Sequence, residues 1–146
     1  MSAPLRFSYG NSMAGVSANN QLARIPINLR HTGQSISAAG LLDTGSTVNV
    51  LPFGLGLQLG FVWDQQTTLP SLTGTLAEVP ARGVIVSGQV GSFAPVDLAF
   101  AWTSTDAVPL LLGQINFFME FDVCFFRSEG VFEVSPKRVL HRQFTE

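Results

Sequence analysis

The chain has 146 residues, of which 46% are hydrophobic and 12% are charged, and its formal net charge is −2. This length is enough for one domain with a hydrophobic core, and the low charge argues against a disordered or coiled-coil protein. The charge balance gives no reason to expect a nucleic-acid partner. Twelve phenylalanines and many Val, Leu and Thr residues favour strands.

No membrane segment, metal site or cofactor is expected. Residues 1–20 lack a basic start followed by an apolar block, so no signal peptide is predicted and a cytoplasmic location is expected. The longest apolar region, residues 108–126, contains amides and carboxylates and is too polar to span a bilayer. Cys124 is the only cysteine and is interpreted as an inert thiol buried in a strand. His31 and His141 are far apart, and His31 is interpreted as a turn residue.

Taken in chain order, the pattern is that of an all-β protein. Residues 1–20 are rich in small and polar residues and are interpreted as a flexible N-terminal arm, within which residues 5–9 have the pattern of a short strand. Further strands are predicted at residues 25–29, 35–42, 48–51, 83–89, 92–102, 110–112, 123–126 and 130–134, with a hairpin over 69–79. Short helices are predicted at 52–59 and 115–121. About ten short strands favour a closed or nearly closed β architecture.

Some residues within these elements carry separate expectations. Pro26 indicates an edge position for its strand, because proline cannot donate to a ladder. Trp63 is expected to pack in the core or under a lid. The basic residues near the C-terminus, in the segment 137–146, are interpreted as a solvated tail.

The strand over residues 35–42 ends directly before Asp43, which is followed by Thr44, Gly45 and Ser46. Gly45 permits a sharp turn that brings backbone N–H groups close to the carboxylate, and the two hydroxyls are possible donors. A carboxylate that receives several donors is able to act as a base. The alternative is an Asp/Gly turn between strands, with no chemistry.

A second stretch, residues 109–118, is apolar and contains Leu112 followed by Gly113. Together with the Asp43 stretch, in this order and at this separation, it resembles the retropepsin-like aspartic proteases, in particular the single-domain bacterial members. The resemblance extends roughly from Ile25 to Val134. It implies a closed β-barrel protease domain over residues 21–136 with a flap hairpin, acting as a homodimeric endopeptidase.

The resemblance also implies roles for individual residues. Asp43 would be catalytic, and because the chemistry needs two carboxylates, the second would come from Asp43 of another copy. Thr44 would hydrogen-bond across the two-fold axis, and the Gly45 N–H would orient the carboxylate. The pair 112–113 would pack behind the Asp43 loop.

The segment Leu72, Thr73, Gly74 and Thr75 is expected to be the tip of the flap, which would clamp a peptide substrate. The glycine permits both the turn and the movement. Without the resemblance, the same segment is an ordinary surface hairpin.

The sequence departs from the viral pattern at three positions. Ser46 and Thr47 stand where viral members usually have Ala and Asp, and Gln114 stands where they usually have Arg. Thr47 and Gln114 replace the Asp–Arg ion pair of the viral members by uncharged residues, which leaves the strength of the dimer open. Ser46 is predicted to donate to the Asp43 carboxylate, which stabilises the ionised form and favours an acidic pH optimum.

Two alternatives remain at this point. One is an inactive retropepsin-like domain that binds peptides or only dimerises. The other is a small β-barrel that binds an apolar ligand. An intact Asp43-Thr44-Gly45 argues against both, because nothing structural requires a buried aspartate there.

Overall fold

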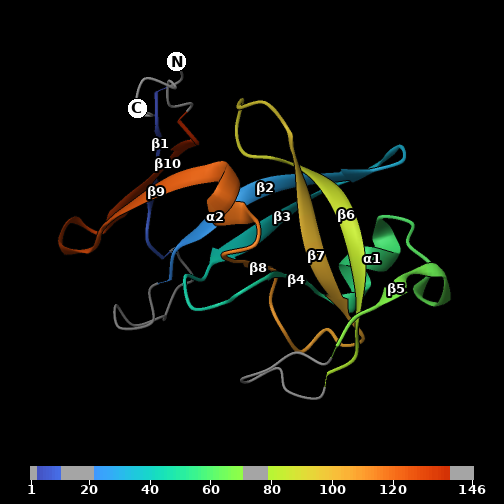
Figure 1. Ribbon diagram of the computed structural model, residues 1–146. Helices are drawn as coiled ribbons and strands as arrows, with labels where there is room; N and C mark the ends of the chain where they lie inside the picture. Colours follow the sequence, from blue (N-terminus) through green and yellow to red (C-terminus); the bar gives the residue numbers. More distant parts are fainter. Residues whose placement is uncertain (1–2, 11–21, 71–78, 139–146) are drawn as a thin grey trace, which may run out of the picture.

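The computed structural model describes residues 3–10, 22–70 and 79–138 and shows a small β-barrel with a separate three-stranded sheet beside it (Figure 1). Ten strands are present in these ranges: β1 (Leu5–Ser8), β2 (Arg24–His31), β3 (Gln34–Leu42), β4 (Asn49–Leu51), β5 (Thr67–Thr68), β6 (Ala81–Gln89), β7 (Val96–Thr103), β8 (Leu111–Leu112), β9 (Phe121–Phe126) and β10 (Val131–Pro136). The helices are all short: α1 (Phe53–Gln58), α2 (Phe117–Glu120) and the 3-10 turns η2 (Trp63–Gln65) and η4 (Arg127–Glu129). Within the same ranges, no helix has the length and apolar character needed to cross a membrane.

The predicted closed barrel is confirmed. Its strands follow the order β2-β3-β8-β4-β7-β6, and β2 pairs with β6 to close the ring. The closure involves residues 28–30 of β2 and 87–89 of β6. Closure of this kind removes exposed sheet edges, so a chain of this size can bury one core. β5 adds to β6 at the end of the order.

Alternation along β2 places its apolar side chains in the barrel. Ile25, Ile27 and Leu29 are buried, whereas their neighbours are exposed. Pro26 pairs with Ala39 of β3 but lies outside the three-residue pairing with β6, so its missing N–H costs no ladder bond there. The strand as a whole is not at an edge, and only its first half has the edge character predicted from Pro26.

The three-stranded sheet has the order β1-β10-β9 and lies on the opposite side of the barrel from α1 and β5 (Figure 1). Residues 5–8 of the expected N-terminal arm form β1 in this sheet, in register with residues 131–134. Phe132 is fully buried, with the ring centroids of Phe7 and Tyr9 at 5.5 Å and 5.3 Å. This aromatic cluster attaches the sheet to the core.

The prediction that Cys124 is buried is wrong, because its side chain is exposed. β9 is an edge strand of the three-stranded sheet, and within it only Phe121, its first residue, is buried. An apolar sequence was therefore not evidence of burial on this strand.

Two predicted boundaries also differ from the structure. The strand predicted over 92–102 begins only at Val96, because Gly91 has φ 54° and the Phe93 N–H bonds to the Val90 carbonyl in a turn. The helix predicted over 115–121 is reduced to α2, because Ile115 instead forms a bridge with Val48. Both segments are apolar enough for a longer strand or helix, but the contacts they make in the folded chain shorten it.

Trp102, which is fully buried, organises the packing of α1 on the barrel. Its indole N–H donates to the Phe53 carbonyl at 3.0 Å. A Cβ at Gly56 would lie 2.1 Å from the same nitrogen, so glycine is required at the point of closest approach. Trp63 contacts Trp102 edge-on with ring centroids 5.0 Å apart, and the guanidinium carbon of Arg82 lies over the Trp63 ring, 4.8 Å from its centroid. The predicted packing role of Trp63 is confirmed.

Candidate active site

Asp43 directly follows β3 and is held against β8, the neighbouring strand of the barrel. Residues 41–42 pair in parallel with residues 111–112 of β8. The Asp43 N–H then donates to the Leu112 carbonyl at 3.0 Å, which continues the pairing by one residue. The backbone of Asp43 is therefore fixed by two strands, β3, which the apolar run before Asp43 predicted, and β8.

The Asp43 side chain is bound by the turn that follows. The Gly45 N–H donates to Oδ1 of Asp43 at 3.0 Å, and the Ser46 N–H donates to the Asp43 carbonyl at 3.0 Å. Asp43 is half-buried in the single chain, whereas Thr44 and Gly45 are exposed. The carboxylate is therefore oriented by backbone but open to a second molecule on one side.

The predicted hydrogen bond from Ser46 to Asp43 is absent. The Ser46 hydroxyl instead donates to the Val48 carbonyl at 2.7 Å. A hydroxyl has one proton to donate, so this bond uses its only donor. Ser46 stabilises the loop and not the charge of Asp43, and the argument for an acidic optimum loses its basis.

Gln114 holds the same loop from behind. Its side-chain amide donates to the Thr44 carbonyl at 2.9 Å, and its backbone N–H donates to the Ser46 carbonyl at 2.9 Å. The next N–H, of Ile115, donates to the Thr47 carbonyl at 3.0 Å. The uncharged residue at this position thus binds the backbone next to Asp43.

Gly113 makes the closest contact between the two predicted stretches. A Cβ at this position would lie 2.4 Å from the Val48 carbonyl oxygen and 2.7 Å from the Ser46 carbonyl oxygen. Any side chain would therefore push the Asp43 loop away from β8. Leu112 is fully buried, and Gly113 lies directly behind the loop.

A buried amide network behind the loop was missed in the sequence. Asn49 is fully buried, and its Oδ1 accepts the Gly113 N–H at 2.8 Å. Its Nδ2 donates to the Ala99 carbonyl at 2.9 Å and to Oδ1 of Asn116 at 3.1 Å. Asn116 in turn accepts from the Ala99 N–H and donates to the Asp97 carbonyl. The signal was a polar residue inside the apolar strand over residues 48–51, which the alternation pattern did not explain.

The predicted flap tip, residues 72–75, lies outside the described residues. Its base is described and has the expected hairpin form: Thr67 pairs with Gly83 and Thr68 with Arg82. The Leu69 N–H also donates to the Ala81 carbonyl at 3.1 Å. The two arms that enter and leave the segment are therefore antiparallel neighbours.

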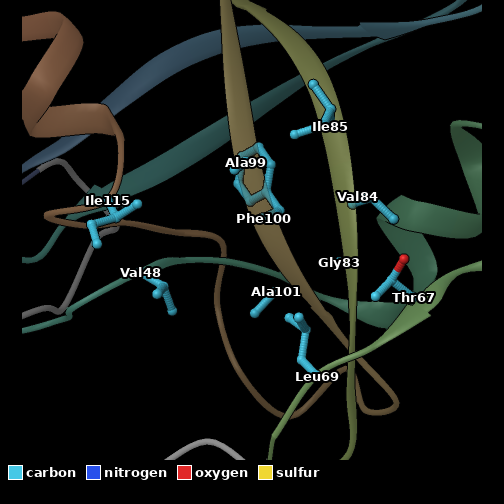
Figure 2. Close-up of a pocket in the computed structure, with 10 residues that line it drawn as sticks. All are labelled: Val48, Thr67, Leu69, Gly83, Val84, Ile85, Ala99, Phe100, Ala101 and Ile115. Atoms are coloured by element: carbon cyan, nitrogen blue, oxygen red, sulfur yellow. The ribbon is translucent and has the colours of Figure 1, made fainter.

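Two hollows of the surface adjoin the site and differ in chemistry. One, of about 320 Å³, is lined mainly by apolar residues of β6 and β7, together with Thr67 of β5, Leu69, Val48 and Ile115 (Figure 2). The other, of about 330 Å³, lies next to Thr44 and Leu42 and extends to Tyr9 and Arg127. Each contains residues of the Asp43 loop or of the strand before it.

No metal site is recognisable in the part of the chain that the structure describes, where three His, Cys, Asp or Glu residues are nowhere grouped suitably. His31 is the last residue of β2 before a turn at Thr32 and Gly33, which both have positive φ. Its Nδ1 lies 3.1 Å from the Leu59 carbonyl, and its ring stacks on Phe61 at 4.0 Å. The histidine has a packing role at this turn.

Comparison with solved structures identifies the fold as retropepsin-like. A retropepsin-like aspartic protease from Rickettsia conorii matches with a TM-score of 0.62 and 13% identity, over 90% of each chain. The EIAV protease in complex with the inhibitor HBY-793 matches with a TM-score of 0.52 and 15% identity, over 68% of this chain and 88% of that one. No protein-family model and no curated protein sequence matches the chain.

Proposed function

We propose that this protein is an aspartic endopeptidase that acts as a homodimer, with Asp43 of each copy forming one catalytic pair. The observation that carries the proposal is the half-buried Asp43 carboxylate, oriented by the Gly45 N–H on a loop braced from behind by Gly113 and Gln114. The Asp43 carboxylate is fixed by the backbone around it and open on one side, in a chain whose fold is retropepsin-like.

The proposed reaction needs both copies. Two carboxylates about 3 Å apart cannot both be ionised, so the pair carries one proton. The ionised Asp43 removes a proton from a water, which attacks the peptide carbonyl, while the protonated Asp43 donates a hydrogen bond to that carbonyl oxygen. Collapse of the tetrahedral intermediate, with a proton delivered to the leaving nitrogen, releases the two products.

The surface around Asp43 supports docking of a second copy there. Thr44 is exposed, its carbonyl accepts the Gln114 side-chain amide, and its hydroxyl takes part in none of the hydrogen bonds of the described residues. The hollow of about 330 Å³ adjoins it and contains both apolar and polar groups, including Arg127. A two-fold axis beside Thr44 would bring the two Asp43 loops together.

The direct test is cleavage of peptides by the purified protein across a series of pH values, with and without pepstatin. We expect a bell-shaped dependence of kcat/KM on pH, because only the singly protonated pair is active. Inhibition by pepstatin is expected. A profile without an acidic limb, together with unchanged activity in pepstatin, contradicts the proposal.

Activity is expected to depend on protein concentration. Because a single chain supplies one carboxylate, the specific activity should fall on dilution in proportion to the dimer fraction measured by sedimentation. A substrate analogue that bridges both copies should restore the dimer at low concentration. Full specific activity in a species shown to be monomeric would falsify the shared pair.

Ser46→Ala is expected to change stability and not the pH profile. Loss of the hydrogen bond to the Val48 carbonyl should reduce the free energy of unfolding by about 1 kcal/mol, measured by urea titration. The basic limb of kcat/KM should not move, because the hydroxyl is not bound to Asp43. A shifted basic limb would show that Ser46 turns to the carboxylate in the dimer.

A further inference from the structure

We infer that Gln114 is a positioning residue for the proposed catalytic pair, and that it acts on the Asp43 carboxylate through the peptide group between Thr44 and Gly45. The inference rests on the proposed function and adds a residue that controls the hydrogen bond to the catalytic charge. The Gln114 side-chain amide donates to the Thr44 carbonyl at 2.9 Å, and the Gly45 N–H donates to Oδ1 of Asp43 at 3.0 Å. That carbonyl and that N–H belong to one peptide group.

The two ends of this peptide group cannot turn independently. The peptide bond between Thr44 and Gly45 is trans, so its C=O and N–H lie in one plane and point in opposite directions. An amide that holds the carbonyl from one side therefore aims the N–H at the carboxylate on the other side. A hydrogen bond accepted by the carbonyl also polarises the peptide group and strengthens the bond that its N–H donates. Gln114 thus affects both the direction and the strength of the Gly45 hydrogen bond.

The Gln114 side chain is exposed, but its backbone is anchored to the same loop. Its N–H donates to the Ser46 carbonyl at 2.9 Å. Gly113, directly before it, has no side chain that would push the two segments apart. Gln114 therefore binds the loop at Thr44 and at Ser46, one residue on each side of Gly45, and spans the turn that carries the N–H donor.

The Gly45 N–H matters because the carboxylate has few other partners. Among the hydrogen bonds of the described residues, it is the one that the Asp43 carboxylate accepts. Neither ion pair in the same part of the chain involves Asp43, and Arg127 is the charged residue that lines a hollow together with Thr44. An uncharged substitution of Gln114 leaves Arg127 in place, so a change in the ionisation of the pair would report the loss of the amide.

The test compares Gln114→Met with Gln89→Met as the matched control. Methionine keeps the length of the side chain, removes the amide donor and adds no charge. Gln89 also donates its side-chain amide to a backbone carbonyl, that of Phe93 at 3.0 Å, and it lies where β6 pairs with β2. The dimer fraction is matched between variants by sedimentation, because Thr44 lies on the proposed dimer face.

Gln114→Met should lower kcat by roughly threefold to tenfold and leave KM within about twofold, because the amide acts on the catalytic carboxylate and not on substrate binding. Both limbs of the pH profile should move to higher pH by about half a unit, since a weaker hydrogen bond stabilises the ionised carboxylate less. Gln89→Met should leave both limbs unchanged. A loss of stability alone does not move them.

A second measurement does not require catalysis. The Gly45 amide proton is followed by NMR across the same pH range. In the wild-type protein it should move downfield as Asp43 ionises, and in Gln114→Met this displacement should fall by at least about a third. Gln114→Arg, which keeps a donor within reach of the Thr44 carbonyl, should retain it.

If no peptide is cleaved, yet Gln114→Met reduces the displacement of the Gly45 proton, the role of Gln114 is supported and the proposed reaction fails. If peptides are cleaved, and the limbs and the Gly45 proton of Gln114→Met match those of the wild type, Gln114 only stabilises the loop and the inference is overturned. Shifted limbs with an unchanged Gly45 proton overturn it as well, because the effect then does not pass through the peptide group.

Discussion

Asp43→Asn is expected to reduce peptide cleavage by at least roughly 10²–10⁴-fold, the range attributed to a positioned acid or base. The amide keeps the shape of the side chain, and its oxygen can still accept the Gly45 N–H. It cannot take a proton from water, and neither copy of the pair retains a carboxylate. The measurement is kcat/KM on one peptide, with circular dichroism and sedimentation to establish that fold and dimer are preserved.

The matched control is Asp64→Asn, since Asp64 is an exposed aspartate in η2 that contacts none of the loop residues around Asp43 in the described hydrogen bonds. It should retain wild-type activity. Substantial turnover by well-folded Asp43→Asn protein, freed of wild-type contamination, would leave the inactive peptide-binding domain as the better interpretation.

Asn49→Ala is expected to cause the largest loss of stability among single polar substitutions near the site. The side chain makes hydrogen bonds to Gly113, Ala99 and Asn116 while fully buried. Its removal leaves buried donors and acceptors unpaired at about 1–3 kcal/mol each, so a total of about 3–5 kcal/mol is expected. For a chain of this length, the melting temperature should fall by on the order of 10 °C.

Asn28→Ala is the control, because Asn28 is exposed and accepts only the Ser35 hydroxyl among the described hydrogen bonds. It should cost no more than about 1 kcal/mol. Both variants are compared at one protein concentration, since dimerisation affects apparent stability. Equal losses in the two variants would show that the amide network does not hold β8 and β4 together.

The sequence by itself determined the all-β class and the position of Asp43 directly after a strand. The reason is that these features depend on local patterns. Apolar runs mark buried strands, and a glycine after such a run marks a turn or close approach. The resemblance to retropepsin-like proteases, carried by the same residues, predicted the closed barrel that the structure has.

Tertiary structure decided where individual side chains bind. Ser46 donates to Val48 and not to Asp43, Cys124 is exposed on a terminal strand, and Asn49 is buried in an amide network. The partners of Asn49 lie up to 68 residues away in the chain, at the Phe117 N–H, whereas the Ser46 bond is made within its own loop, two residues away. A hydroxyl, thiol or amide group can form a hydrogen bond with several kinds of partner, so the residue type alone does not determine which partner it binds. The fold makes that selection by deciding which groups lie within hydrogen-bond distance and which strand lies at the edge of a sheet.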